Sequence, residues 1–369
     1  MEISLTLLPE RLQLALAQTP QDPAFHGEGD VAKHTEAVCR AMRDTESWQK
    51  GNAATRQVLE LAALLHDLGK IPCTRWEDGH LVSPGHGRVG SEMARQFLWQ
   101  ELGLCGTPEK IALREAVCAL IRDHGLPPHA IDESDGKLRL LRFAADGALS
   151  PGITAENLCA LSEADIRGRI CSDELPLLEQ VQLCRELAAE SGCLQTPYAF
   201  PDDHTAYAFL SGRNISPEYP LYNDTWGSVT LMSGLPGTGK DTWIRENLPD
   251  MPMISLDEIR TEQKISPTDN QEPVVQLARE RARELLRKKQ PFIWNATNLT
   301  PMTRQKQIHL FCDYGASVEI VYLETTREEQ FSRNANRPDA VPEGAVCHML
   351  EKLTPPRRME AHTVRWICV

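Results

Sequence analysis

The sequence contains no run of 18 consecutive apolar residues, so we expect no membrane-spanning helix. Its first residues, MEISLTLLPERLQLALAQ, include charged side chains and lack the continuous apolar stretch of a signal peptide. The 11 cysteines have no paired spacing, and their odd number is typical of reduced thiols rather than of a disulfide framework. No internal repeat is present. These absences favour a soluble protein of the cytoplasm.

An excess of basic charge is also lacking. The net charge is −13, which argues against a protein that coats nucleic acid. Residues 226–369 carry 19 basic and 19 acidic side chains, so the whole acidic excess lies in the first 225 residues. A chain of 369 residues is long enough for two domains, and this asymmetry favours two domains with different tasks. The acidic half is rich in histidine, which suggests metal binding, and the neutral half can still carry a local basic groove.

The first half of the chain has a helical pattern. Apolar residues recur at intervals of three and four in stretches such as Gln57–Leu68 and Pro108–Arg122. The second stretch also has a proline at a plausible first helical position. We therefore expect a mostly helical domain over residues 1–195.

The composition changes after this domain. Residues 196–226 contain four prolines and 7 of the 21 aromatic residues, and they form either a packed connector or a base-stacking surface. From residue 227 onward, strand-like and helix-like segments alternate, which predicts a parallel sheet with helices on its faces. We expect an α/β domain over residues 227–369.

Candidate metal ligands lie in the helical half. The stretch LLHDLGK places His66 next to Asp67 within a helical pattern. Adjacent helical residues point about 100° apart, so one ion bound by both needs further ligands from other helices. His34, His86 and His124 lie in separate segments and are such candidates. Imidazole and carboxylate groups bind divalent transition metals, and a metal-bound hydroxide would attack a phosphoester.

The order and local sequence of these residues resemble the HD phosphohydrolase superfamily. Over about residues 30–172, HDLGK, DGHLVSPGHGRVGSEMA, LIRDHG and LSEADIRGR look like the HD modules of CCA-adding tRNA nucleotidyltransferases and of related end-healing phosphatases. The resemblance implies an all-α fold with one or two ions such as Mn²⁺, Co²⁺, Ni²⁺ or Zn²⁺. It implies one ion held by His34, His66, Asp67 and a distal aspartate, and a second held by Asp67, His86 and His124.

The distal aspartate has two candidates. Asp165 in EADIRGR matches the related modules, and Asp146 in FAADG resembles other HD branches. We favour Asp165. Arg169 follows it by four residues and is well placed to contact a phosphate, and Lys70, one turn after His66, is expected to face the same pocket.

The second half contains GLPGTGKDT, a phosphate-binding loop between a strand-like stretch and a helix-like one. Backbone amides of such a loop cradle phosphates, and Lys240 reaches the β and γ oxygens of ATP or another NTP. The expected nucleotide-binding residues are Gly234, Gly237, Thr238, Gly239, Lys240, Asp241 and Thr242.

Asp241 stands where this motif ordinarily offers a serine or threonine hydroxyl to Mg²⁺. Related kinases carry a metal-directed carboxylate near a later strand end, but FIWNATNLT has Asn295 there and no acid. One hypothesis is that Asp241 supplies the carboxylate from the loop side, with Thr242 as support. The alternative is that Asp241 only favours the positive helix N-terminus while Thr242 takes the metal role.

Two further stretches suit phosphoryl transfer. In PMISLDEIR, Asp257 can accept the proton of an attacking hydroxyl and Arg260 can bind a substrate phosphate, although a helix cap with a surface arginine explains them equally well. In SRNANRPDA, Arg333 and Arg337 lie four residues apart on one predicted helical face, as in a lid that stabilises charge or a surface salt-bridging helix.

Over about residues 228–355, the loop, D-x-x-R, TNLTP and R-N-x-x-R together resemble the kinase domain of phage-type polynucleotide 5′-hydroxyl kinases. This resemblance implies that Asp257 is the general base, that Arg260 holds the phosphate beside the acceptor nucleotide, and that Arg333 and Arg337 close over the donor. It also implies Mg²⁺ with the NTP.

The two halves together look like bacterial HD-type end-healing enzymes. Such an enzyme removes 2′,3′-cyclic or terminal 2′/3′ phosphates, phosphorylates 5′-hydroxyl ends of RNA or DNA, and leaves ends that a ligase can join. The alternatives are a small-molecule kinase fused to a nucleotide phosphohydrolase, or a nucleotide-sensing regulator. The sequence does not distinguish RNA from DNA.

Overall fold

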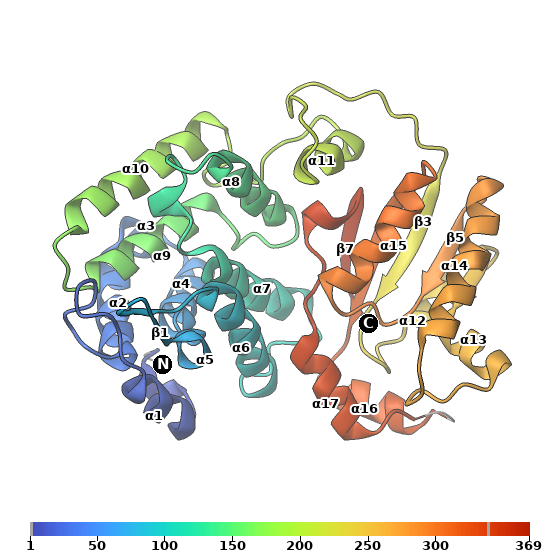
Figure 1. Cartoon of the computed structure of the whole chain (residues 1–369), viewed down its shortest axis with the longest axis horizontal. Helices are drawn as coiled ribbons and strands as arrows, with labels where there is room; N and C mark the ends of the chain where they lie inside the picture. Colours follow the sequence, from blue (N-terminus) through green and yellow to red (C-terminus); the bar gives the residue numbers. More distant parts are fainter. Residues whose placement is uncertain (1–2, 338–339) are drawn as a thin grey trace. The chain divides into compact units, whose positions relative to one another are not determined.

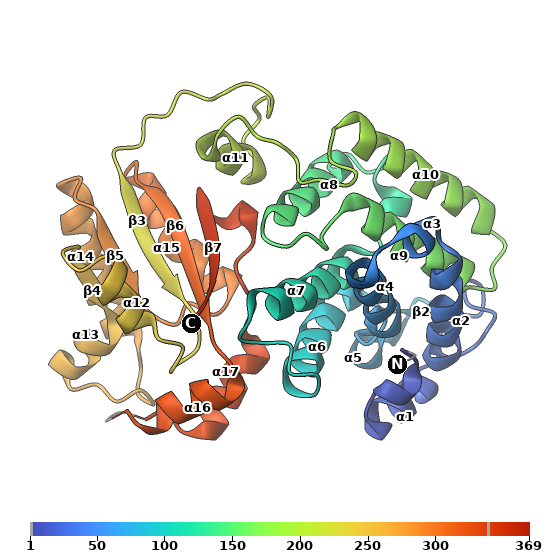
Figure 2. The same ribbon diagram turned by 180° about the vertical axis from the view of Figure 1, so that it is seen from behind.

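The computed structural model describes residues 3–337 and 340–369. The chain divides into two compact units. The first comprises Met1–Leu104 and Glu109–Ala199, and the second comprises Cys105–Pro108 and Phe200–Val369. Figure 1 shows helices in the first unit and a helix-flanked sheet in the second, and Figure 2 shows them from behind. Among the described residues, no helix has the length and apolar character that a membrane crossing requires.

The first unit is helical apart from one short hairpin. Its helices and 3₁₀ turns are η1 (Leu5–Leu7), α1 (Glu10–Gln18), α2 (Val31–Asp44), α3 (Glu46–Lys50), α4 (Ala53–Leu65), α5 (Lys70–Cys73), α6 (His86–Gln100), α7 (Pro108–Asp123), η2 (Pro127–His129), α8 (Gly136–Ala145), η3 (Asp146–Ala148), α9 (Ala155–Arg167) and α10 (Glu174–Glu190). The antiparallel hairpin consists of β1 (Arg75–Glu77) and β2 (His80–Val82).

Helices α2, α4 and α9 pack against one another at the centre of this unit. Each begins at a residue whose side chain accepts a hydrogen bond from the first turn: Asp30, Asn52 and Thr154. Most of α4 is buried, as its apolar sequence VLELAALL requires. Because α4 lies in the core, the residues that follow it are also buried, which places the HD dipeptide inside the unit.

The second unit is built on a parallel five-stranded sheet of order β4-β5-β3-β6-β7. The predicted fold class, an all-α domain followed by an α/β domain with a parallel sheet, is confirmed. The strands are β3 (Ser228–Ser233), β4 (Met253–Ser255), β5 (Phe292–Asn295), β6 (Ser317–Glu324) and β7 (Thr363–Cys368). The helices are α11 (Asp203–Leu210), α12 (Lys240–Asn247), α13 (Leu256–Gln263), α14 (Glu272–Arg287), α15 (Pro301–Asp313), α16 (Arg327–Ala335), α17 (Glu343–Lys352) and η4 (Arg358–Glu360).

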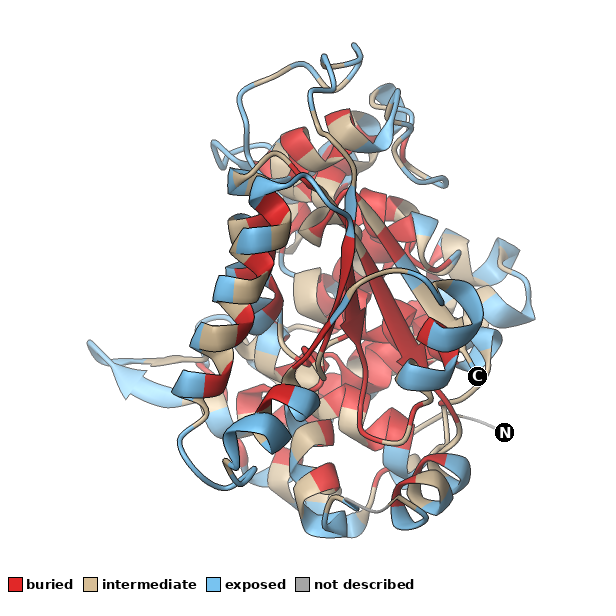
Figure 3. Cartoon of the chain, turned by 90° about the vertical axis from the view of Figure 1, so that its right-hand side faces the viewer, coloured by how far each residue is buried: buried red, intermediate tan, exposed pale blue. Residues whose placement is uncertain are grey.

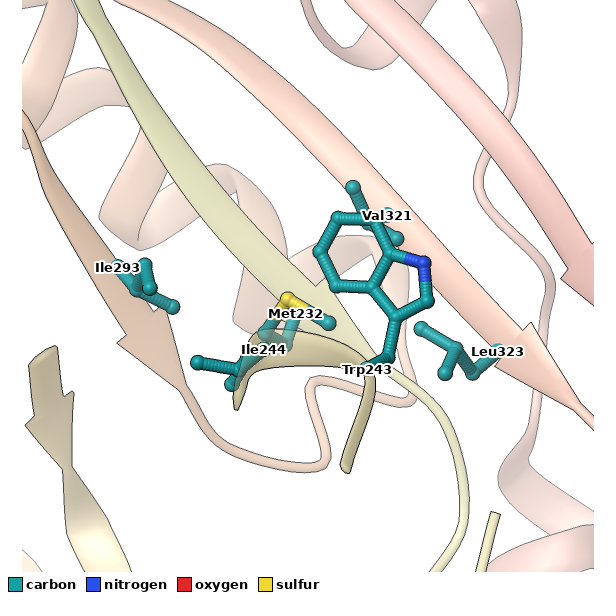
Figure 4. Packing of buried hydrophobic residues seen from close by; sticks show 6 residues of the cluster. All are labelled: Met232, Trp243, Ile244, Ile293, Val321 and Leu323. Carbon is teal, nitrogen blue, oxygen red and sulfur yellow. The ribbon is translucent and has the colours of Figure 1, made fainter. Parts of the chain in front are cut away.

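Both faces of the sheet are covered, so its central strands are buried (Figure 3). On one face, Trp243 and Ile244 of α12 pack on apolar side chains of β3, β5 and β6 (Figure 4). On the other face, Phe311 of α15 contacts Phe292 and Trp294 of β5. Successive strand residues point to opposite faces. This alternation explains why the first three residues of β5 are all apolar, and the packing of Trp243 and Ile244 holds α12, the helix after the phosphate loop, against the sheet.

The aromatic segment 196–226 contains α11 and an extended stretch. Trp226 donates its indole N–H to Tyr314 O at 2.7 Å, and Tyr207 packs against His362. Tyr219 and Tyr222 are instead 71% and 85% exposed. The segment therefore combines aromatic residues packed on the second unit with others that face solvent.

Candidate metal centre and nucleotide-binding loop

Separate elements bring the candidate metal ligands of the first unit together. Each ligand lies in a buried part of a helix or at a helix end, so its position is determined by core packing. His34 lies on the buried face of α2, His66 and Asp67 follow α4, His86 begins α6, His124 follows α7, and Asp165 lies in the last turns of α9.

The HD dipeptide lies just after a helix, whereas the sequence predicted it within one. Helix α4 ends at Leu65, and the chain turns before α5 begins. Gly69 lets this turn pack closely on α6, because a Cβ at this position would lie 2.0 Å from His86 O and 2.5 Å from Gly90 N. Only glycine permits this close approach to α6. The turn thereby carries Asp67 toward the residues at the start of α6.

One cluster contains His34, His66, Asp67 and Asp165. His34 Nε2 lies 2.9 Å from Asp165 Oδ1 and 3.5 Å from Asp67 Oδ2. His66 Nε2 lies 3.2 Å from Asp67 Oδ2 and 3.4 Å from His34 Nε2. All four residues are buried. Their nitrogen and oxygen atoms converge on one point, as ligands of a single ion do.

A second cluster shares Asp67 with the first. His86 Nε2 lies 3.7 Å from Asp67 Oδ1 and 3.2 Å from His124 Nε2. These three side chains offer ligand atoms within 4.8 Å of one another, as do those of His34, His66 and Asp67. The two carboxylate oxygens of Asp67 therefore face different clusters, which is the arrangement of a bridging ligand.

The hydrogen-bond partners of three of the four imidazoles show that these rings present acceptors to the clusters. In His66, His86 and His124, Nδ1 lies 2.7 to 2.8 Å from the carbonyl oxygen three residues earlier. A carbonyl oxygen only accepts, so each Nδ1 carries the hydrogen and each Nε2 of a neutral ring presents a lone pair. Asp67 Oδ1 is buried and, among the described residues, has no hydrogen-bond donor. Converging lone pairs and carboxylates fit divalent cations, the ions that HD domains bind.

Burial and charge also favour the metal-binding protonation states. Burial, reinforced by the neighbouring His86, lowers the pKa of His124 to about 4, so its ring is neutral at physiological pH. Burial alone would raise the pKa of Asp165, but the positive charge of Arg169 holds that pKa well below its usual range. Neutral imidazoles and ionised carboxylates are the forms that bind metals.

Cationic side chains lie beside the clusters. A pocket of about 330 Å³ is lined by His86, His124 and Asp165 together with Lys70 and Arg169. Lys70 Nζ lies 2.7 Å from Asp67 Oδ2 and also donates to Gln21 Oε1 at 2.7 Å. Arg169 pairs with Asp165. The pocket thus presents positive groups next to the ligand clusters, where a phosphate could be held.

The two candidates for the distal ligand differ in position. Asp165 contacts His34, as described above. Asp146 begins η3 and lies 3.5 Å from the guanidinium of Arg122. Of the two, the structure places Asp165 with the other HD residues, and its role as a ligand stays a prediction.

Glu28 belongs to this centre, although the sequence did not indicate it. Its Oε1 lies 2.9 Å from His34 Nδ1 and 2.8 Å from His26 Nδ1. Burial alone would raise the pKa of Glu28, but hydrogen bonds from His34 and the Ile170 amide lower it overall. Glu28 lies in the loop before α2, where no periodicity reveals which side chains point inward. The available signal was the spacing H-x-E a few residues before His34.

In the second unit, β3 leads through the glycine loop into α12. Gly237 and Gly239 have φ angles of 82° and 86°, in the left-handed region that favours glycine. Lys240 Nζ donates to Gly234 O at 2.9 Å and to Leu235 O at 2.8 Å. Burial lowers the pKa of Lys240 to about 8. The lysine is thus held in the loop, close to where a phosphate would bind.

Asp241 and Asn295 are in direct contact. Asn295 Nδ2 donates to Asp241 Oδ1 at 2.8 Å, from the end of β5 to the first turn of α12. Asn295 is buried, whereas Asp241 is exposed. Thr242 is also exposed, and its hydroxyl accepts from Arg245 at 3.3 Å. Thr238 is buried and its hydroxyl donates to Leu235 O. Of these three polar side chains, Asp241 is the one that β5 orients.

Asp257 and the predicted arginines lie around the loop. Asp257 is in the first turn of α13, beyond the strand end where the sequence placed it, because Ser255 ends β4 and caps this helix. It pairs with Arg260 at 2.5 Å and lies 4.0 Å from Arg337. Asp257 and Arg337 both act electrostatically on Lys240. The structure thus brings a carboxylate and two guanidinium groups close to the phosphate loop.

Arg333 and Arg337 do not share a helical face as predicted. Helix α16 ends at Ala335, and Arg337 lies beyond it. The residue before a proline is disfavoured in a helix, and Pro338 follows Arg337 in the sequence. Arg333 lies beside Gly239 and pairs with Glu329 at 2.5 Å. The two arginines therefore approach the loop from different elements, one from a helix and one from the segment after it.

Comparisons with known families agree with both sites. Residues 30–165 match the family model of the HD domain, and residues 229–356 match that of an AAA domain. A search of curated proteins found no match. The matched ranges contain the histidine and aspartate clusters and the phosphate loop, respectively. The chain therefore joins an N-terminal helical HD domain to a C-terminal P-loop domain whose α/β fold is kinase-like.

Proposed function

We propose that this protein is a bifunctional nucleic-acid end-healing enzyme. Its HD domain removes 2′,3′-cyclic or terminal 2′/3′ phosphates, and its P-loop domain phosphorylates 5′-hydroxyl ends with an NTP. The proposal is carried by the presence in one chain of two candidate phosphate-handling sites, the buried histidine and aspartate clusters and the phosphate loop. Breaks that leave phosphate at one end and hydroxyl at the other need both reactions before a ligase can act.

The residues of the HD pocket support the hydrolytic half. When bound, a divalent metal supplies an activated water and neutralises charge on the phosphoryl oxygens. Lys70 and Arg169 provide cationic groups for the remaining phosphate oxygens. Glu28 orients His34, and the carbonyl oxygens behind the other rings hold their Nε2 atoms toward the clusters. The chain's own residues thus bind and orient the phosphate beside the metal centre.

Asp257 and its arginine neighbours support the transfer half. Asp257 accepts the proton of the 5′-hydroxyl as the hydroxyl oxygen bonds to the γ-phosphorus, and the bond from that phosphorus to the β–γ bridging oxygen breaks to release NDP. Lys240 contacts the phosphates from the loop. Arg260 binds the acceptor phosphate, and Arg333 and Arg337 stabilise charge on the donor.

We further propose that Asp241 supplies the carboxylate directed at the Mg²⁺ of the kinase. The contact from Asn295 supports this role, because the amide restrains a carboxylate that would otherwise be free at the surface. In that case the carboxylate comes from the loop, at Asp241, and the uncharged amide stands at the strand end, at Asn295, where we expected an acid. The alternative, a metal contact from Thr242, lacks such an orienting contact from the sheet.

The charge distribution is compatible with nucleic-acid ends as substrates. An enzyme that recognises an end contacts a few phosphates and does not neutralise a long duplex, so a net charge of −13 does not oppose the proposal. We place the protein in the cytoplasm, where the free cysteines would stay reduced. A nucleic-acid ligase is the expected downstream partner, because it consumes the product ends.

Label transfer from γ-labelled NTP to a 5′-hydroxyl oligonucleotide tests the kinase, and phosphate loss from a 2′,3′-cyclic end tests the HD domain. The proposal predicts that Lys240→Ala abolishes only the first reaction and Asp67→Ala only the second. Transfer to nucleosides or sugars without transfer to oligonucleotides would favour a small-molecule enzyme. Nucleotide binding without either reaction would favour a regulator.

A further inference from the structure

The β1–β2 hairpin carries an exposed tryptophan next to the HD pocket. Trp76 is 70% exposed, although a tryptophan side chain on a protein surface normally packs against neighbours. The hairpin joins α5, which contains Lys70, to α6, which begins with His86. The elements on both sides of the hairpin thus contribute residues to the lining of the pocket.

The strand register shows which face of the hairpin bears this ring. Trp76 lies opposite Leu81, and cross-strand partners point to the same side. Thr74 and Ser83, two residues beyond each of them, share that side because side chains alternate, and their hydroxyls lie 2.8 Å apart. Thr74, Leu81 and Ser83 all line the HD pocket. Trp76 therefore continues the pocket-lining face of the hairpin outward to its rim.

Asp22 fixes the hairpin to the opposite side of the same rim. Its Oδ2 accepts from the Leu81 amide at 3.3 Å and lies 3.2 Å from His80 Nδ1. Its Oδ1 accepts from the Ala24 amide at 2.9 Å, within the turn that presents Phe25. Phe25 lines the pocket and is 53% exposed. One carboxylate thus holds two segments: one places Phe25 in the lining of the pocket, and the other carries Trp76 on the same face as the pocket-lining Leu81.

We propose that Phe25 and Trp76 form a nucleobase-binding rim on the HD pocket, so that the hydrolysed phosphate belongs to a nucleotide or to the terminal nucleotide of a strand. The inner part of the pocket contains histidines, carboxylates, Lys70 and Arg169, which suit a phosphate. The rim is aromatic, and every base has a flat face that stacks on such rings. A volume of about 330 Å³ is at the small end for ligand pockets, which fits one nucleotide rather than a longer stretch.

This inference deepens the proposed function of the HD domain, and paired substrates test it. We compare hydrolysis of adenosine 2′-monophosphate with hydrolysis of glycerol 2-phosphate, which carries the phosphate but no base. Trp76→Ala should raise KM for the nucleotide by roughly 5- to 100-fold, as expected for loss of one stacking partner, and leave KM for glycerol 2-phosphate unchanged. Trp76→Phe should retain most of the affinity. Leu14→Ala removes an exposed apolar side chain of α1 that does not line the pocket and should change neither KM.

A binding measurement separates this inference from the proposed activity. Stacking on Trp76 should quench tryptophan fluorescence when the Mn²⁺-loaded protein is titrated with adenosine 2′-monophosphate, and Trp76→Phe should remove most of that change. If the nucleotide is hydrolysed but Trp76→Ala leaves its KM unchanged, or raises both KM values equally, the rim does not bind a base. If stacking is observed but no nucleotide or oligonucleotide end is hydrolysed, the base rim stands and the proposed phosphatase activity is wrong.

Discussion

Asn295 donates its side-chain amide to Asp241 across 2.8 Å, joining the end of β5 to the residue after the phosphate-loop lysine. Strand β5 lies beside β3 in the sheet, so the ends of these strands and the loop after β3 are neighbours. Asp241 and Asn295 together provide one carboxylate and one amide, so the site still has one carboxylate. The contact thus joins Asp241, which stands where the loop motif has a serine or threonine, to Asn295, which stands at the strand end where we expected an acid.

If Asp241 is the metal-directed carboxylate, exchanging the two residues should preserve the site. Asp241→Asn should weaken Mn²⁺ binding in the presence of ADP by at least about tenfold, since one ligand charge is lost. Adding Asn295→Asp to that variant should restore much of the binding, because the carboxylate returns on the other side of the same contact. Electron paramagnetic resonance of Mn²⁺ measures this without catalysis. Normal binding in Asp241→Asn, with loss in Thr242→Ala, would support the alternative.

The identity of the distal HD ligand can be determined from metal content. Asp165→Ala should lose bound metal and phosphatase activity, because Asp165 Oδ1 lies 2.9 Å from His34 Nε2. Asp146→Ala should retain bound metal, since Asp146 pairs with Arg122 instead. Elemental analysis of both purified variants gives the answer. Retention of metal in Asp165→Ala and loss in Asp146→Ala would reverse the assignment.

Glu28 should act on the metal through His34. Glu28→Gln removes the charge that fixes the Nδ1 side of the ring, and we expect a 10- to 100-fold loss of Mn²⁺ affinity, the usual cost of losing such a partner. Competition with a fluorescent chelator measures the affinity. Glu36→Gln is the matched control, since Glu36 lies on the exposed face of α2. Equal affinities in the two variants would show that Glu28 does not position His34.

The partly buried lysine of the loop predicts a pH dependence of nucleotide binding. The pKa of Lys240 is lowered to about 8 by burial, so the free protein loses this positive charge as the pH rises above 8. Phosphates bind the charged form, so ADP affinity should decrease by up to about tenfold per pH unit above 8 and be nearly constant from 7 to 7.5. Calorimetric titrations between pH 7 and 9.5 test this. A dissociation constant that does not change up to pH 9.5 would contradict it.

A buried ion triad should dominate the stability of the HD domain. Glu115 lies 3.0 Å from Arg95 and 2.7 Å from Arg114, and all three residues are buried. Glu115→Ala removes the buried carboxylate that neutralises both guanidinium groups and should lower the free energy of unfolding by about 3–5 kcal/mol. The exposed pair of Arg88 and Glu92 is the control, and Glu92→Ala should cost less than about 1 kcal/mol. Urea unfolding followed by circular dichroism measures both, and similar costs for the two variants would contradict the prediction.

The sequence predicted the fold class, and it indicated candidate residues that the structure brings together at each site, because these signals are local. The apolar period of α4 and the position of HDLGK after it indicate where His66 enters the core. The strand, glycine loop and helix that surround Lys240 are consecutive in the chain. Such signals depend on short-range periodicity and backbone conformation, which a single sequence displays.

Other features depend on contacts that periodicity does not encode. Glu28 lies in a loop, so its contact with His34 follows from the path of that loop and not from a repeating pattern. The contact of Asp241 with Asn295 requires β5 to lie beside β3, and this strand order is a property of the whole sheet. Likewise, α16 ends before Arg337 although the spacing of the two arginines suits a helix, because the residue before a proline is disfavoured in a helix.

A single oligonucleotide with a 5′-hydroxyl and a 2′,3′-cyclic phosphate tests the central claim most directly. The oligonucleotide is incubated with the protein, NTP, Mg²⁺ and Mn²⁺, and both ends are identified by mass spectrometry. The proposed function predicts a product with a 5′-phosphate and a free 2′,3′-diol, with the 5′ change lost in Lys240→Ala and the 3′ change lost in Asp67→Ala. An oligonucleotide recovered with both ends unaltered, under conditions where the protein binds NTP and metal, would contradict it.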